Sequence, residues 1–398
     1  MTTNQTAAVP GISSGMVLLL ASATGLIVAN LYYAQPLVGP ISQATGLSPG
    51  AAGLIVTLTQ IGYCLGMLFI VPLGDLLENR RLIVTCLAAT SAALLVAAST
   101  SNAGLFLAAA LCIGLGSVAA QVVVPFASHL SPPHMRGQIV GKVVSGLLMG
   151  IMLARPVSSL VTDALNWHAI FVLSAIGTAL LAVLLHYKLP RRQPVSSMRY
   201  GALLASLWQL LKSTPVLRRR AAYQACMFGA FSLFWTTVPL VLARQFNLSQ
   251  TGIAIFALAG VAGAIASPYA GRRADQGKSR STTGMALAAA LIAFGAPLLL
   301  QGGRVVELGL LVAASIVLDA GVSASLVTGQ RAIFSLGEDV RSRLNGLYMA
   351  IFFCGGAIGS SLGAWMYAHH GWHGVLLTGL AFPLAASLVY ATEFIGKE

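Results

Sequence analysis

The chain is organised as long apolar runs separated by short polar or basic segments. Twelve runs can be delimited, at residues 15–39, 51–77, 81–100, 103–127, 138–161, 168–188, 221–243, 251–274, 282–301, 306–329, 343–368 and 373–393. Each is close to the roughly 20 residues that a helix needs to cross a bilayer. The runs do not alternate apolar with polar residues, which favours helices over barrel strands. The pattern predicts an all-α integral membrane protein with twelve transmembrane helices.

Composition supports this class, because 57% of the 398 residues are hydrophobic and only 8% are charged, against roughly 25% charged in soluble domains. The formal net charge is +13. In a soluble protein this excess would suggest a nucleic acid partner, but in a membrane protein basic residues collect in cytoplasmic loops. With a cytoplasmic N-terminus, 20 of the 23 Lys and Arg fall in inner loops, Arg244 and Arg304 fall outside, and Arg155 lies within a span. We therefore expect both termini in the cytoplasm and no nucleic acid partner.

Enzymatic chemistry has no visible basis in the chain. The five cysteines lie inside apolar runs without paired spacing, which is typical of packing residues. No P-loop lysine motif, nucleophile elbow or zinc ligand spacing occurs. We therefore expect no catalytic residues, cofactor or metal, and energy from an ion gradient.

An internal repeat predicts two halves. "GDLLENR" at Gly74 resembles "ADQGKSR" at Ala274, an offset of 200 residues, and "WH" at Trp167 recurs at Trp372, an offset of 205. Such duplications are common in secondary transporters. We expect a six-helix bundle at 1–188, a basic cytoplasmic linker at 189–220 and a second bundle at 221–398.

Several motifs resemble the major facilitator superfamily, and more narrowly its bacterial drug-efflux-like permeases of the acriflavine-sensitivity type. They are "ANLYYAQPL" (29–37), "VPLGDLLENRRL" (71–82), "GSVAAQVVVPFA" (116–127), "GRRADQGKSR" (271–280), "RSRLNGLYM" (341–349) and "GGAIGSSLG" (355–363). The resemblance implies two six-helix bundles that rock about a central cavity. Helices 1, 4, 7 and 10 would line that cavity, and helices 2, 5, 8 and 11 would form the interface between the halves.

Two charges interrupt the apolar runs. Asp319 lies about 13 residues, or roughly 20 Å, into the tenth run. A carboxylate there costs at least about 2.5–3.5 kcal/mol, so we interpret it as a proton carrier or a counter-charge for a cationic substrate, with a structural ion pair or packing hydrogen bond as the alternative. Arg155, in the fifth run, is its candidate partner. It has two alternatives: binding an anionic substrate, or extending outward to the membrane surface.

Other polar and aromatic residues complete the candidate site. Cavity-lining candidates are Asn30, Tyr32, Tyr33, Gln35, Gln121, Phe234, Trp235, Gln330 and Arg331; for the tyrosines the alternative is anchoring at the membrane surface, and for the other polar residues it is hydrogen bonding between helices. Gating candidates in the cytoplasmic loops are Asp75, Arg80, Arg136, Asp275, Arg280 and Arg341. A loop carboxylate can accept hydrogen bonds from a helix N-terminus and pair with Arg80, Arg136 or Arg341, although a loop charge that only sets topology is the alternative.

The sequence thus predicts a proton-coupled secondary transporter of the bacterial inner membrane, monomeric and multi-pass. We expect it to export small hydrophobic or cationic compounds, with protons and the lipid bilayer as its other partners. The alternative is a proton symporter that imports a small organic anion or metabolite. A receptor or enzyme that does not transport would need a soluble domain or a catalytic constellation, and the sequence shows neither.

Overall fold

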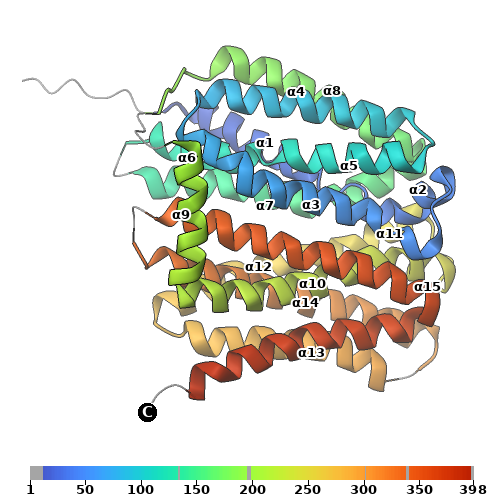
Figure 1. The fold of residues 1–398 in the computed structure, drawn as a ribbon. Helices are drawn as coiled ribbons and strands as arrows, with labels where there is room; N and C mark the ends of the chain where they lie inside the picture. Colours follow the sequence, from blue (N-terminus) through green and yellow to red (C-terminus); the bar gives the residue numbers. More distant parts are fainter. Residues whose placement is uncertain (1–11, 133–134, 195–198, 301, 338–339, 396–398) are drawn as a thin grey trace, which may run out of the picture.

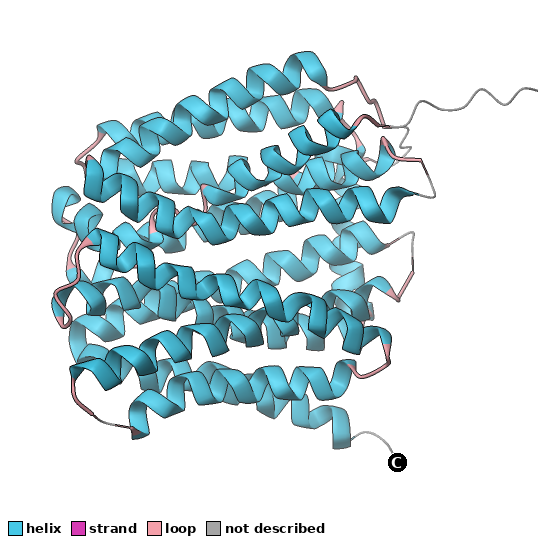
Figure 2. Ribbon diagram, turned by 180° about the vertical axis from the view of Figure 1, so that it is seen from behind, coloured by secondary structure: helices cyan, strands magenta, loops and turns pink. Residues whose placement is uncertain are grey.

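The computed structural model describes residues 12–132, 135–194, 199–300, 302–337 and 340–395, and these form helices joined by short loops, without a strand (Figure 2). The first half of the chain forms α1 (Ser14–Ala29), η1 (Gln35–Leu37), α2 (Val38–Thr45), η2 (Pro49–Ala51), α3 (Leu54–Phe69), η3 (Val71–Asp75), α4 (Asn79–Ser99), α5 (Ala103–Ser117), α6 (Ala119–His129), α7 (Arg136–Ala164) and α8 (Trp167–Lys188).

The remaining helices are α9 (Tyr200–Ser213), α10 (Pro215–Arg244), α11 (Gln250–Ala257), η5 (Leu258–Gly260), α12 (Val261–Asp275), α13 (Ser279–Leu299), α14 (Arg304–Phe334) and α15 (Arg341–Ile395). The last of these is two helices that meet at Gly371, where φ is 62°. Nine helices of the described residues are long and apolar enough to cross a membrane, one of them containing both parts of α15. With α1 and the interrupted segment α11–η5–α12, the prediction of twelve crossings is confirmed.

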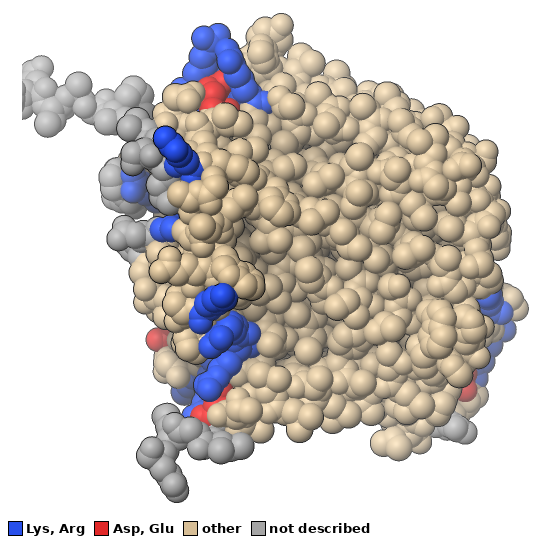
Figure 3. Space-filling model, in the orientation of Figure 1, with Lys and Arg blue, Asp and Glu red and all other residues tan. Residues whose placement is uncertain are grey.

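The helices lie roughly parallel in two groups, with α1–α8 above and α10–α15 below in Figure 1. Helix α9 runs across one end of both groups. Basic residues gather at that end, which also carries the chain's C-terminus, and the surface between the two ends is largely uncharged (Figure 3). We call this end, with the loops that contain Arg80, Arg136 and Arg280, the basic end, and the opposite one the far end.

Asparagine and serine caps begin several helices at the far end. The Asn102 and Asn166 Oδ1 atoms accept from the amides of residues 105 and 169, at 3.0 and 3.1 Å. The Ser249 hydroxyl accepts from the amide of residue 252 at 3.2 Å. Each cap satisfies an amide that has no partner within its own helix. Three far-end helices therefore begin with uncharged caps.

The two groups meet where α3 packs on α15 and α7 on α11. The Ser360 hydroxyl donates to the Gly53 carbonyl at 3.0 Å, and the Thr57 hydroxyl donates to the Ala357 carbonyl at 3.2 Å. Further along the same contact, the Cys64 and Cys354 sulfur atoms are 3.1 Å apart. At the other contact, the Thr251 hydroxyl on α11 donates to an oxygen of Asp163 on α7 at 2.6 Å. These contacts are made by spans 2, 5, 8 and 11, the four helices that the sequence resemblance implied for the interface, and span 2 pairs with 11 and span 5 with 8.

Candidate functional site

The centre of the candidate site is a carboxylate in the middle of the membrane-spanning part. Asp319 is the midpoint of α14, about 22 Å along the axis from either end of that helix. Its side chain is buried, and Trp235 on α10 donates from Nε1 to the Asp319 Oδ1 atom at 2.8 Å. A buried carboxylate is retained only where hydrogen bonds or charges compensate its desolvation. Trp235 supplies one such bond from the neighbouring helix.

A buried guanidinium faces the same space from α7. The Arg155 Nε atom donates to the Gln35 Oε1 atom at 2.8 Å. Its Cζ atom lies 5.3, 4.9 and 4.3 Å from the ring centroids of Tyr32, Phe231 and Trp235. Cations are attracted to aromatic faces, and more strongly where water is excluded. Three aromatic rings therefore form a cage around the Arg155 guanidinium.

Arg155 and Asp319 share this space without a direct ion pair between them. Gly260, at the end of η5, lies beside both: a Cβ atom built on it would lie 2.8 Å from Asp319 Oδ2 and 3.5 Å from Arg155 Nη1. Trp235 contacts both, because its ring faces Arg155 and its N–H binds Asp319. The two charged groups therefore lie within a few ångströms of the same two residues, Gly260 and Trp235. Each also has side-chain atoms that could bind another ligand.

Two buried donors of this site have no hydrogen-bond partner among the described residues. They are Nη2 of Arg155 and Nε2 of Gln35. A buried donor without a partner is costly, so it indicates a group that a ligand or water satisfies in another state. The void beside Arg155 and Trp235 measures only about 10 Å³, which is barely the space of one water molecule. In this conformation the site is closed to a substrate.

The remaining cavity candidates in the first half of the chain lie outside this cluster. Asn30 accepts a 2.5 Å hydrogen bond from the Ser174 hydroxyl on α8, so it joins two helices of one group. Tyr33 is buried in the turn that follows α1, where it lines an external groove. Gln121 on α6 donates to the Tyr63 hydroxyl at 2.9 Å.

The cavity candidates of the second half are also divided. Trp235 belongs to the site, whereas its neighbour Phe234 packs edge-on against Phe294 in the core. Gln330 donates to the Asn345 Oδ1 atom at 3.2 Å. Arg331 lies at the basic end of α14 and is largely exposed. The structure thus brings together Asp319, Arg155, Gln35, Tyr32 and Trp235 from the candidates for coupling and cavity lining.

Among the gating candidates, Asp275 has a clear partner. Its Oδ1 atom is 2.5 Å from Nη2 of Arg331, so the end of α12 is tied to the end of α14. Both side chains are more than half exposed, and exposed pairs contribute at most about 1 kcal/mol. Asp75, at the end of η3, is approached by the charges of Arg192, Arg343 and His129.

The arginine gating candidates bind backbone carbonyls or Glu393 at the basic end. Arg80 donates to the His186 carbonyl at 3.1 Å, at the end of α8. Arg136 donates to the Ser131 carbonyl at 3.4 Å. Arg280 binds Glu393 on α15, and Arg341 donates to the Phe334 carbonyl at 3.4 Å. These bonds tie together loops and helix ends within each group, whereas the expected partners of the loop aspartates were Arg80, Arg136 and Arg341.

Sequence reasoning missed three features of the site region. Phe231 and Gly260 carry no signal in an apolar run, although Gly260 ends a 3-10 turn that interrupts the eighth span. Glu393 accepts from the Tyr223 hydroxyl at 2.8 Å and pairs with Arg220 at 3.8 Å, which joins α10 to α15 at the basic end. Within the described residues, no cluster of three His, Cys, Asp or Glu side chains is arranged to hold a metal.

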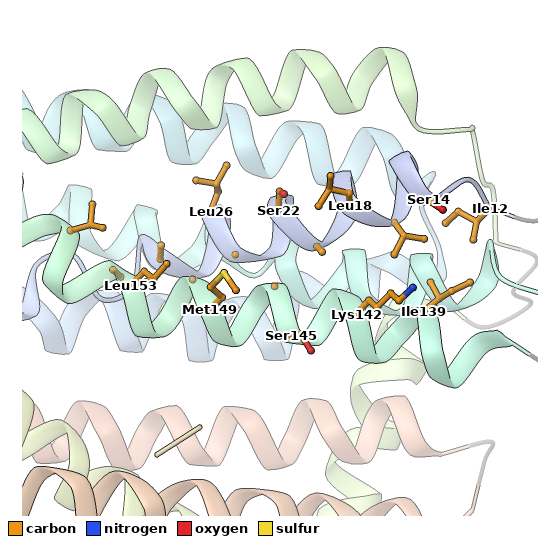
Figure 4. Close-up of a pocket in the computed structure, with 18 of the residues that line it drawn as sticks. Ile12, Ser14, Leu18, Ser22, Leu26, Ile139, Lys142, Ser145, Met149 and Leu153 are labelled. Carbon is orange, nitrogen blue, oxygen red and sulfur yellow. The ribbon is translucent and has the colours of Figure 1, made fainter. Parts of the chain in front are cut away.

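A larger cavity than the void beside Arg155 lies elsewhere. A groove of about 820 Å³ runs along α1 and α7 on the outside of the bundle (Figure 4). Neither Arg155 nor Asp319 lines it.

Comparison with known proteins identifies the family. Residues 20–308 match the model of the Major Facilitator Superfamily. The chain belongs to the major facilitator superfamily. One relative of this transporter is the uncharacterized transporter YgaY of Escherichia coli O157:H7, 39% identical, with 97% of this chain and 98% of the relative covered. A probable transporter of Streptomyces coelicolor is 33% identical over 90% of this chain and 82% of its own.

Solved structures show the same fold. A bacterial homologue of the human lysosomal transporter Spinster has a TM-score of 0.72 at 14% identity, with 96% of both chains covered. The nucleoside transporter NupG has a TM-score of 0.72 at 15% identity, with 96% of this chain and all of that chain covered. The predicted major facilitator fold is therefore confirmed. Family and relatives make this protein a multi-pass membrane transporter.

Proposed function

We propose that this transporter is a proton-coupled exporter of small hydrophobic or cationic compounds in the bacterial inner membrane, with the basic end in the cytoplasm. The closer resemblance to drug-efflux permeases of the acriflavine-sensitivity type is part of this proposal. So is the division into bundles at 1–188 and 221–398 with a linker at 189–220, which would rock to alternate access to the site.

The observation that carries the proposal is the buried carboxylate of Asp319 with one hydrogen bond and no direct ion pair. A carboxylate in this position can be neutralised by a proton, by a cationic substrate or by movement of Arg155 towards it. Only one of these can neutralise it fully at a time. Substrate binding would therefore release the proton, and protonation would release the substrate, which is an exchange cycle.

The aromatic cage supports a substrate with cationic or flat apolar groups. Tyr32, Phe231 and Trp235 now face Arg155 at 4.3–5.3 Å. A substrate cation would compete with the guanidinium for these rings and for the carboxylate. Displacement of Arg155, which lies on α7, would then transmit occupancy of the site to the contact between α7 and α11.

The alternative, a proton symporter that imports a small organic anion, has one observation in its favour. Nη2 of Arg155 and Nε2 of Gln35 are both buried donors without a partner. A carboxylate or phosphate would accept from both donors, and bonds to a charged acceptor are the stronger kind.

Flux in everted membrane vesicles tests the proposal, with ethidium as a lipophilic cation and benzoate as an organic anion. We expect ethidium to accumulate when the lumen is acidified, and an uncoupler to abolish this. Asp319→Asn should lose gradient-driven accumulation while its unfolding temperature stays close to that of the wild type. Wild-type accumulation by Asp319→Asn would refute the role of the carboxylate, and benzoate movement down the proton gradient, with ethidium inert, would favour the symporter.

A further inference from the structure

The external groove between α1 and α7 is a cavity that the proposed transport cycle does not use. Its rims are large apolar side chains, among them Leu18 and Leu26 on α1 and Met149 and Leu153 on α7, all of which are exposed. Figure 4 shows these side chains along the two helices. Because both helices cross the membrane, the rims lie against lipid hydrocarbon.

The groove is deep because the two helices touch through their backbones. A Cβ atom on Gly146 would lie 2.2 Å from the Ala21 carbonyl oxygen, and one on Gly150 would lie 2.1 Å from the Gly25 carbonyl oxygen. No side chain can therefore fill the floor, while the rim side chains project beyond it. An apolar concave surface of this size is typical of a site for an apolar ligand.

One end of the groove is polar and positively charged. Among the described residues that line it, Lys142 is the one charged residue, and the lining also includes the Ser14 and Ser145 hydroxyls. The Lys142 nitrogen points towards the end formed by Ile12 and Ile139 (Figure 4), which is the basic end.

The spacing of charge and apolar surface matches one leaflet of a bilayer. From Lys142 to Leu153 the α7 axis rises about 16 Å. The hydrocarbon core is about 30 Å thick, so one leaflet supplies about 15 Å of acyl chain. A lysine at the end of such a chain lies at the level of a lipid phosphate.

We propose that this groove binds the acyl chain of an anionic phospholipid from the leaflet at the basic end, with its phosphate against the Lys142 ammonium. The bound lipid packs along α7, the helix that carries Arg155 and contacts the second group of helices. It therefore supports the α1–α7 contact in the bundle while α7 shifts during transport.

Native mass spectrometry of the full-length protein, stripped of lipid and titrated in micelles, tests the site without any transport measurement. The probes are the anionic lipid dioleoylphosphatidylglycerol and the zwitterionic lipid dioleoylphosphatidylcholine. A lysine near the membrane surface contributes about 1 kcal/mol to binding an anionic lipid, so we expect about a fivefold preference for phosphatidylglycerol. Lys142→Gln should abolish the preference, and Lys142→Arg should keep it. Lys188→Gln, which changes an exposed lysine at the end of α8 outside the groove, should also keep it.

A second variant tests the apolar part of the groove. Ser22 is exposed and lines the groove, so Ser22→Trp fills the space without crowding the core, and it should reduce the bound phosphatidylglycerol. Unchanged preference in Lys142→Gln, or unchanged binding in Ser22→Trp, would overturn the proposal. A dimer that Ser22→Trp converts to monomer would also overturn it, because a second copy would then occupy the groove.

Discussion

Gly260 is the position at which the geometry of the central site can be tested with one methyl group. A Cβ atom there would lie 2.8 Å from Asp319 Oδ2 and 3.1 Å from Trp235 Cζ2, whereas ordinary contacts begin at 3.4 Å. In Gly260→Ala the carboxylate must therefore retreat by about 0.6 Å, or the helices must separate. Both groups that must move belong to the hydrogen bond between Trp235 and Asp319.

The size of the effect follows from overpacking in a closed site. Extra carbon in a packed core typically costs about 1–3 kcal/mol. The void beside Arg155 holds only about 10 Å³ and does not adjoin Gly260, so it offers no relief. We therefore expect Gly260→Ala to lower the unfolding temperature in detergent and to reduce proton-driven flux, because the carboxylate that exchanges the proton is displaced.

Gly309→Ala is the matched control for this substitution. Gly309 lies on α14, the helix of Asp319, and a Cβ atom there would have nothing within 4 Å. Alanine in an exposed helix is favoured over glycine by up to about 1 kcal/mol, so this variant should be as stable as the wild type or slightly more stable. If Gly260→Ala matched the control in both unfolding temperature and flux, the arrangement of the site described above would be refuted.

Three further experiments, an oxidation and two variants, probe other contacts. Oxidation with copper phenanthroline should join Cys64 to Cys354, whose sulfur atoms are 3.1 Å apart, and stop transport until a reductant is added; transport by a fully cross-linked protein would show that the α3–α15 contact need not open. Trp235→Phe removes the donor to the α14 carboxylate, and should cost about 1.5–3 kcal/mol in thermal unfolding; no loss would mean that the bond is unimportant. Glu393→Gln weakens the acceptor of the Tyr223 hydroxyl and should destabilise by about 1–3 kcal/mol, less in high salt; a salt-independent loss would argue against an electrostatic cause.

The transmembrane helices could be located from the sequence because burial in hydrocarbon demands continuous apolar residues. The structure of the linker could not be predicted from the sequence in the same way. Helix α9 has Leu203 and Leu207 buried against the bundle, but it lies among basic residues and is too short to span. Its start is held by the Tyr200 hydroxyl, which donates to the Phe69 carbonyl at 2.8 Å, a contact between distant segments that no local pattern indicates. Helix α10 already begins at Pro215, inside the segment predicted as linker.

The charged members of the candidate site were visible because charge in an apolar run is rare and costly. Arg155 and Asp319 stood out for this reason, and the structure places them in one closed space. The aromatic and small residues that shape this space did not stand out, because Phe231 and Gly260 are ordinary in a membrane helix. The partner of Asp275 also escaped prediction, since pairing between exposed loop charges depends on loop backbone geometry and not on residue type.

The offset of 205 residues relates Asp319 to Gly114, so of these two positions only the one in the second half carries a carboxylate. A Cβ atom on Gly114 would lie 2.0 Å from the Thr59 carbonyl oxygen and 2.8 Å from the Tyr63 amide nitrogen, because α5 meets the backbone of α3 there. In the second half, Gly260 in η5 leaves its side-chain space to the Asp319 carboxylate, which a Cβ atom would approach to 2.8 Å. A carboxylate at position 114 would therefore require α3 to move away from α5, whereas position 319 has room for one because its neighbour is a glycine.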